Sequence, residues 1–267
     1  MPERFSYNIL GHFAEGGIAT LERIVLEDGR KAILRELQSS KIFSIKQQIT
    51  FRRGIRIRAM LSPHPRMTNS LEFGAKGLRP YEIIEYIEGK NLKALVNNRD
   101  EVVRNNMMFI IRECAEALAW IHSNGFMHLD VKPENFIICT TGDKPIVKLT
   151  DFDLAQKATN NGPYKQSGTP AYMAPEQFKQ KKAFMASDVF AFSVMAYLLV
   201  TGKQPFVSST QKGSLHKQAS DSYTPKAPIE HVPDLPIKLN NAIMTGLEKR
   251  LDRRFPDMNT FLKQIRN

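Results

Sequence analysis

The chain has 267 residues, of which 42% are hydrophobic, so it can bury a large core in one domain or in two lobes around a cleft. This composition excludes a disordered chain, and two cysteines without metal-type spacing exclude a disulfide framework and a structural zinc site. The formal charge of +11 favours anionic partners without choosing among them. No signal-peptide pattern opens the chain, and a cytoplasmic location is expected.

The first third of the sequence predicts strands joined by tight turns. Residues 21–26 and 31–37 flank Asp28-Gly29, which favours a hairpin because both central positions of such a turn need positive φ. A helix is expected within 46–61, where a proline-rich segment ends it. Residues 81–87 form a further strand-like run.

The rest of the sequence favours helices. Apolar residues recur at helical spacing through 107–121, and Asn124-Gly125 supplies a stop. The longest apolar stretch, 189–200, contains Ser193 and is too short to span a bilayer, so it is interpreted as a buried core helix. We expect a boundary between two lobes near Gly89.

One segment carries much of the positive charge. No Asp or Glu occurs from Leu37 to Leu71, and the basic residues within it are Lys41, Lys46, Arg52, Arg53, Arg56, Arg58 and Arg66. Charge runs are usually solvated surface. A wet basic face and a docking surface for an anionic partner at Arg52–Arg58 therefore remain as alternatives.

The most informative stretch is HLDVKPEN at 128–135, followed sixteen residues after Asn135 by Asp151-Phe152-Asp153. Phosphoryl transfer needs an oriented hydroxyl, metal ions on the phosphates and neutralisation of developing charge. Asp130 can accept the hydroxyl proton, and Lys132 can lie against the transferring group. Asn135 and Asp151 offer the oxygen ligands that Mg²⁺ prefers. Each aspartate taken alone could also be a turn or cap residue.

The order and spacing of these residues resemble the catalytic loop and metal-binding motif of protein kinases, over essentially the whole chain. Residues 168–176, GTPAYMAPE, are similar to the end of a kinase activation segment, and 187–193 to the buried helix that follows it. Arg254 matches the arginine that family members pair with the last glutamate of that segment, here Glu176.

The resemblance implies an α+β, bilobal protein-kinase-like fold over residues 1–267. The N-lobe, 1–88, would hold a small antiparallel sheet and one helix, and the C-lobe, 89–267, would be larger and mostly helical. The implied partners are ATP with Mg²⁺ and a protein substrate. Neither a membrane span nor a nucleic-acid partner is expected.

The hinge and the type of kinase also follow from the resemblance. Backbone groups of Glu85 and Ile87 would bond the adenine edge, with Ile84 as gatekeeper. Lys132 together with Thr169 is similar to Ser/Thr rather than Tyr kinases, and dual specificity stays open. Leu129 stands where many members have arginine, so activity is not expected to depend on phosphorylation at its three candidate sites, Thr159, Ser167 and Thr169.

The glycine-rich loop departs from the family pattern. Residues 14–21 cover its positions with only the central glycine in place, and alanine restricts positive φ. Phosphate cradling would be weaker without being lost. The loop residues assigned to nucleotide binding are Ala14, Gly16, Gly17, Ala19 and Leu21.

Three further positions depart from the pattern. Arg35 replaces the lysine that meets the α- and β-phosphates, and arginine is longer and bulkier than an ammonium. If Arg35 serves the phosphates, lysine there should preserve or raise activity. The best alignment puts Gly54 where a helix glutamate should pair with this cation, so other contacts or a partner must hold the helix. Asp153 replaces the last glycine of D-F-G, as a metal-proximal oxygen or as a carboxylate bonding its own turn.

These observations favour a Ser/Thr protein kinase that transfers the γ-phosphoryl group of ATP to a protein hydroxyl. The alternative is a pseudokinase that acts as a nucleotide-binding or allosteric module, because the clamp residues are altered. A third class would transfer a phosphoryl or nucleotidyl group to an acceptor other than protein.

Overall fold

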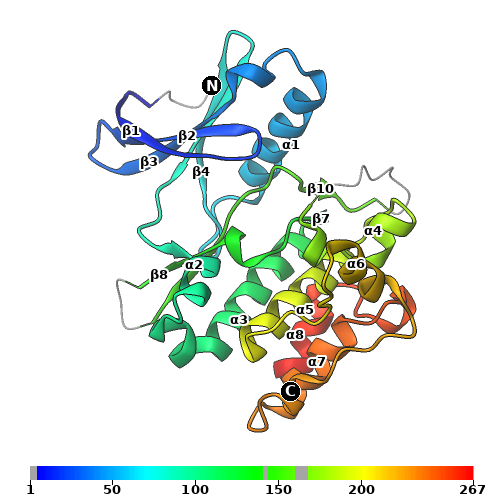
Figure 1. The fold of residues 1–267 in the computed structure, drawn as a ribbon. Helices are drawn as coiled ribbons and strands as arrows, with labels where there is room; N and C mark the ends of the chain where they lie inside the picture. Colours follow the sequence, from blue (N-terminus) through cyan, green and yellow to red (C-terminus); the bar gives the residue numbers. More distant parts are fainter. Residues whose placement is uncertain (1–4, 141–143, 160–167, 267) are drawn as a thin grey trace.

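The computed structural model describes residues 5–140, 144–159 and 168–266, and its first part is an antiparallel sheet in the order β1-β2-β3-β5-β4 (Figure 1). The strands of this sheet are β1 (Tyr7–Glu15), β2 (Ala19–Leu26), β3 (Lys31–Leu37), β4 (Ser70–Lys76) and β5 (Arg79–Glu85). The predicted hairpin is confirmed, because β2 pairs with β3 and Gly29 has a φ of 84° in the turn, but Asp28 does not share the positive φ that was expected at both central positions. The strand predicted at 81–87 is present but lies two residues earlier, because β5 begins at Arg79 and its pairing with β3 and β4 ends by Glu85.

Helix α1 (Ile45–Leu61) packs beside this sheet. The Ser44 side chain caps its first turn, accepting from the backbone N–H of Gln47, and Ser62 ends it before Pro63. The helix buries Phe51 and Ile55 against the end of β3. The predicted helix is therefore present, and it covers one end of the sheet.

The second part is mostly helical (Figure 1). Its α-helices are α2 (Leu92–Asn97), α3 (Glu101–Ser123), α4 (Pro175–Lys179), α5 (Met185–Thr201), α6 (Gln211–Ala219), α7 (Ile237–Gly246) and α8 (Met258–Arg266). Its short strands are β6 (Lys90–Asn91), β7 (Phe126–Met127), β8 (Phe136–Cys139), β9 (Ile146–Leu149) and β10 (Gln156–Lys157). Strands β6, β8 and β9 form one small sheet, and β7 pairs with β10.

The main core lies between α3, α5, α7 and α8. Helix α5 is buried along nearly its whole length, as predicted for 189–200, and Gly202 ends it in the left-handed conformation. Residues from α1 and from the segment 149–155 join the same core, which connects the two parts of the chain. Within the described ranges, no helix is both long and apolar enough to cross a membrane. The bilobal α+β architecture is the predicted one.

Candidate functional site

The loop at 128–131 is held from below by Asp188 on α5. The buried carboxylate of Asp188 accepts from the backbone N–H groups of His128 (2.7 Å) and Leu129 (2.8 Å), and it faces His122 Nε2 at 3.0 Å. Leu129 has a φ of 64°, which costs free energy for a branched side chain. The two hydrogen bonds to Asp188 therefore stabilise the left-handed backbone at Leu129, which sets the position of the next residue, Asp130.

Asp130 is the centre of a compact polar cluster. Lys132 Nζ donates to Asp130 Oδ2 (2.7 Å) and to Thr169 Oγ1 (3.0 Å), and the Thr169 hydroxyl donates to Asp130 Oδ1 (3.3 Å). The amide nitrogen of Asn135 donates to the Asp130 backbone carbonyl at 2.7 Å. The predicted residues Asp130, Lys132 and Asn135 are thus brought together, with the carboxylate near the surface in a side chain that is 10% exposed.

The donor set beside this cluster fits a magnesium ion. Since the Asn135 nitrogen is used by Asp130, its amide oxygen is the atom left for a metal. Asp151 has a φ of 61°, and its Oδ1 accepts from the Asp153 backbone N–H at 3.3 Å. One amide oxygen and one carboxylate suit Mg²⁺, which keeps waters and phosphate oxygens as its other ligands. Among the residues with assigned positions, His, Cys, Asp and Glu form no cluster of three that could hold a metal alone.

The loop between β1 and β2 is tied to the segment after β3. Gly16 N–H donates to Ala19 O at 2.8 Å, which closes a tight turn. Gln38 Nε2 donates to Gly16 O at 3.1 Å, and Lys41 Nζ donates to Gly17 O. These contacts hold the exposed loop between β1 and β2 in one position relative to the segment after β3.

The other loop positions lie where strand pairing puts them. Ala14 is opposite Leu21 in the β1–β2 ladder. Ala19 is buried with Phe51 and Leu37, so its methyl group packs into the N-terminal core. A small apolar residue is therefore favoured at position 19 for packing.

The hinge residues follow β5. Ile84 is buried between Ile33 and Ser70 in the sheet, and the Glu85 side chain accepts from Lys148 Nζ at 2.8 Å. Ile87 is half-buried just beyond the strand. The roles of Ile84, Glu85 and Ile87 at the adenine stay a prediction.

Arg35 belongs to a buried chain of charges that links strands β3 and β5 to helix α1 and to Asp153. Its Nη1 donates to Glu82 directly across from it on β5, and its Nη2 donates to both Asp153 oxygens, at 2.9 and 3.0 Å. Arg58 of α1 donates to the same Glu82 oxygen at 2.6 Å. Burial raises the pKa of the Asp153 carboxyl to about 6, against the opposing pull of the Arg35 guanidinium. The Asp153 carboxylate thus binds Arg35, which neither role expected for it included.

The basic segment is not a continuous basic face. Arg58 is fully buried, with its guanidinium 5.2 Å from the Phe152 ring centroid, and Arg53 is half-buried. The interpretation of Arg52–Arg58 as one surface is wrong at Arg58, because this side chain turns inward to pair with Glu82. The same pair supplies the contact that holds α1 without a helix glutamate.

The activation-segment glutamate has the partner that was predicted for it. Arg254 Nη1 donates to Glu176 Oε1 at 2.8 Å, and both side chains are buried. The Ser187 hydroxyl donates to the same oxygen at 2.6 Å. Of the three candidate phosphorylation sites, Ser167 falls outside the described residues, and Thr169 is bonded within the Asp130 cluster.

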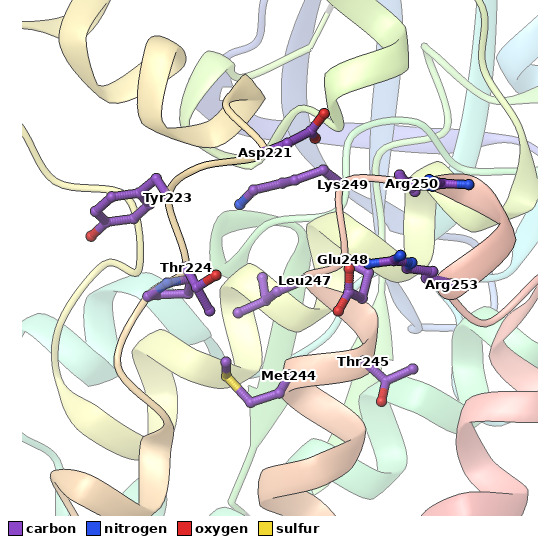
Figure 2. A pocket seen from close by; sticks show the side chains of 11 residues that line it. Asp221, Tyr223, Thr224, Met244, Thr245, Leu247, Glu248, Lys249, Arg250 and Arg253 are labelled. Carbon is purple, nitrogen blue, oxygen red and sulfur yellow. The ribbon is translucent and has the colours of Figure 1, made fainter.

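A separate cavity of about 210 Å³ lies in the C-terminal part, between the loop at 221–225 and the end of α7 (Figure 2). Lys249 extends across it near Asp221, and its Nζ lies 3.7 Å from the Phe206 ring centroid. Burial lowers the pKa of Lys249 to about 8. None of the residues lining this cavity belongs to the motifs of the Asp130 cluster.

Two buried residues of the charge chain were missed by sequence reasoning, namely Glu82 and the inward-facing Arg58. The signal for Glu82 is an acidic residue inside the apolar strand RPYEIIE, where an unpaired carboxylate would be costly. Asp188 was noticed only as part of a similar helix, and its support of the 128–131 loop was not foreseen. A basic residue within a helix carries no comparable sign that it points inward.

The fold and this arrangement of loops are those of a protein kinase domain. The family model described as protein kinase domain matches residues 7–262, so the chain belongs to the protein kinase family. The chain is 30% identical over 271 residues to the serine/threonine-protein kinase PknA of Mycobacterium tuberculosis, covering 97% of this chain and 60% of that protein.

Two further relatives are also bacterial. A probable serine/threonine-protein kinase of Clostridium acetobutylicum is 32% identical over 205 residues, which cover 75% of this chain and 30% of that protein. The probable serine/threonine-protein kinase PknB of Lactococcus lactis is 27% identical over 266 residues, covering 97% of this chain and 41% of that protein. The chain thus spans less than two thirds of the length of these relatives.

Proposed function

We propose that this chain is a Ser/Thr protein kinase that transfers the γ-phosphoryl group of ATP to a protein hydroxyl. The observation that carries the proposal is the Asp130 cluster, where a proton acceptor, a cation and a metal-ligand amide meet within hydrogen-bond distance. The names of the similar bacterial proteins, all serine/threonine kinases, support the acceptor class.

The transfer assigns a separate task to each residue. The acceptor oxygen forms a bond to the γ-phosphorus while the bond to the β–γ bridging oxygen breaks, and Asp130 receives the hydroxyl proton. Lys132 neutralises charge on the transferring group, and Asp130 orients the hydroxyl through the position that Thr169 and Lys132 give its carboxylate. Mg²⁺, held by Asn135 and Asp151, would neutralise phosphate charge when bound.

The nucleotide would occupy the space between the sheet and this cluster. Its adenine edge would meet the backbone of Glu85 and Ile87 beside Ile84, and the loop residues Ala14, Gly16, Gly17, Ala19 and Leu21 would cover the phosphates. Arg35 keeps a cation at the strand position that faces them. Nothing in the described ranges favours the pseudokinase alternative over this function. An anionic partner at the basic segment would have only its outward residues, such as Arg56, to use.

The experiment is a transfer assay with labelled ATP, Mg²⁺ and a generic basic protein as acceptor. We expect labelling by the wild-type chain, and none by Asp130→Ala or in EDTA. Asp221→Ala is the matched control, because it removes an exposed aspartate of the C-terminal cavity. Equal labelling by Asp130→Ala, or no labelling by the wild type, would overturn the proposal.

A further inference from the structure

The carboxylate partners of the Arg35 guanidinium are Glu82 on strand β5 and Asp153 in the metal-binding motif, and neither partner lies on α1. Asp153 contributes both of its oxygens, at 2.9 and 3.0 Å, and the two side chains are 7% and 13% exposed. A charged pair with so little water around it is stable only in good geometry. The direction in which Arg35 points is therefore set by where Asp153 lies.

Helix α1 approaches the segment 151–153 more closely than any side chain would allow. A Cβ placed on Gly54 would lie 2.7 Å from the carbonyl oxygen of Phe152 and 3.0 Å from the Asp153 Cα, and both are backbone atoms. Glycine inside a helix costs about 0.5–1 kcal/mol relative to alanine. Its presence here permits the approach that brings Asp153 to Arg35, and it excludes a carboxylate at position 54.

Helix α1 is attached to the sheet by other means. Arg58, one turn beyond Gly54, donates to Glu82 at 2.6 Å, and Glu82 also accepts from Arg35. Two arginines and two carboxylates therefore neutralise one another in a chain that runs from α1 through β5 and β3 to Asp153. In this chain of charges α1 contributes a cation, Arg58, and the metal-binding motif contributes a carboxylate, Asp153.

We infer that Asp153 is the positioning residue for Arg35, doing from the metal-binding motif what a carboxylate on α1 would otherwise do. The orientation of the phosphate-facing cation is then coupled to the conformation of 151–153, with Gly54 as the contact that permits the coupling. This inference rests on the proposed function only in taking Arg35 to face the nucleotide phosphates.

The test is a double-mutant cycle on nucleotide binding, which does not require turnover. The variants are Arg35→Met, Asp153→Asn and the two combined, each titrated with ATP by calorimetry in Mg²⁺ and again in EDTA. A residue that acts through Arg35 gives non-additive effects. We expect Asp153→Asn to weaken ATP binding about tenfold, the size of one charge-assisted hydrogen bond, in the wild-type background. In the Arg35→Met background we expect no further loss.

The inference is overturned if Asp153→Asn leaves the affinity unchanged, or weakens it equally with and without Arg35. An effect confined to Mg²⁺ and absent in EDTA would also overturn it, because it would make Asp153 a metal-proximal residue. Glu36→Gln is the matched control. This residue is a neighbouring β3 carboxylate that pairs with Lys76 and Arg79 instead, and its loss should leave ATP binding unchanged.

A second variant covers the case in which the charge changes prevent folding. Gly54→Ala keeps every charge and adds only the methyl group that would press on Phe152 O. We expect it to weaken ATP binding severalfold in the wild-type background and not in Arg35→Met. A Gly54→Ala chain that is folded by circular dichroism and binds ATP as tightly as wild type would contradict the coupling. Failure of transfer with this binding pattern intact would count against the proposed function alone.

Discussion

The C-terminal catalytic cluster and the N-terminal nucleotide clamp differ in how closely they follow the protein kinase pattern. In the C-terminal part, Asp130, Lys132, Asn135 and Asp151 are all present, and the buried Glu176–Arg254 pair has the predicted partner. In the N-terminal part, the strand cation and its helix partner are both changed, and Asp153, the last residue of the metal motif, is changed with them.

The difference has a physical reason. Proton acceptance and metal ligation need particular atoms at particular places in the transition state, so few residue types can replace them. A clamp needs only a cation held in one direction, and its carboxylate can come from any nearby element. Here the carboxylate comes from Asp153 of the metal-binding motif and not from α1, where Gly54 leaves room for the approach. The pair of Glu82 and Arg58 attaches α1 to the sheet.

The C-terminal framework should be the more fragile of the two regions to charge removal. Glu176→Gln leaves the Arg254 guanidinium with only backbone carbonyl acceptors and the neutral amide, because both side chains of this pair are buried. We expect a loss of about 3–5 kcal/mol in the free energy of unfolding, measured by urea titration. A loss below about 1 kcal/mol would show that this pair does not anchor the region.

The chain of charges around Arg35 should be more tolerant, because its two central members, Glu82 and Arg35, each have two partners. Arg58→Met leaves Glu82 with Arg35, so we expect a loss of about 2 kcal/mol by the same measurement. Arg56→Met, on the exposed side of the same helix, is the control, and it should change the unfolding free energy by less than about 0.5 kcal/mol. Equal effects of the two substitutions would place Arg58 outside any network.

The features that the sequence could predict are those with local signals. The hairpin at Asp28-Gly29, the helix ending before Pro63 and the buried helix around Ser193 follow from local turn chemistry and hydrophobic periodicity. The Asp130 cluster follows from motif spacing. All of these signals lie within short stretches of the chain.

The rebuilt clamp could not be predicted, because its contacts join residues far apart in the chain. Arg35 and Asp153 are 118 positions apart, and nothing local to either residue names the other. Arg58 also shows why charge composition misleads, since a basic residue on a helix is usually solvated and this one points inward. The Arg35–Asp153 contact and the inward direction of Arg58 both depend on how α1 packs against Phe152.

The clamp should require arginine at position 35. Lysine has a shorter side chain and a single donor nitrogen, so it lacks the planar fork whose two nitrogens reach Glu82 and Asp153 separately. These two partners lead us to expect the opposite of what the sequence alone suggested, namely that lysine would preserve or raise activity. We expect Arg35→Lys to weaken ATP binding about tenfold, or about 1.4 kcal/mol by calorimetry. Binding as tight as wild type would show that Arg35 is a simple point charge.

The smallest expected effect concerns Lys249, whose buried charge destabilises the C-terminal part. Lys249 Nζ has no hydrogen-bond partner among the described residues, and burial lowers the pKa of this amine to about 8. Lys249→Met should therefore raise the unfolding free energy at pH 7 by about 1 kcal/mol, a value reduced because the side chain is partly exposed.

The pH dependence provides the check on this prediction. Below pH 8 the amine is charged in both states, so the folded wild type bears the full cost of burying the charge. As the pH rises from about 8 towards the unfolded pKa of about 10.5, the folded state loses its proton first and the cost of burying the charge falls. The advantage of Lys249→Met should shrink across this window, and a constant advantage would exclude the amine as its cause.

The most direct test of the division between the two regions is to measure ATP affinity and saturated transfer rate for Asp130→Asn and Arg35→Met side by side. We expect Asp130→Asn to bind ATP as the wild type does and to transfer about 10²–10⁴-fold more slowly. Arg35→Met should bind ATP at least tenfold more weakly and still transfer at saturating ATP. Loss of affinity in Asp130→Asn, or unchanged affinity in Arg35→Met, would contradict a separate catalytic cluster and clamp.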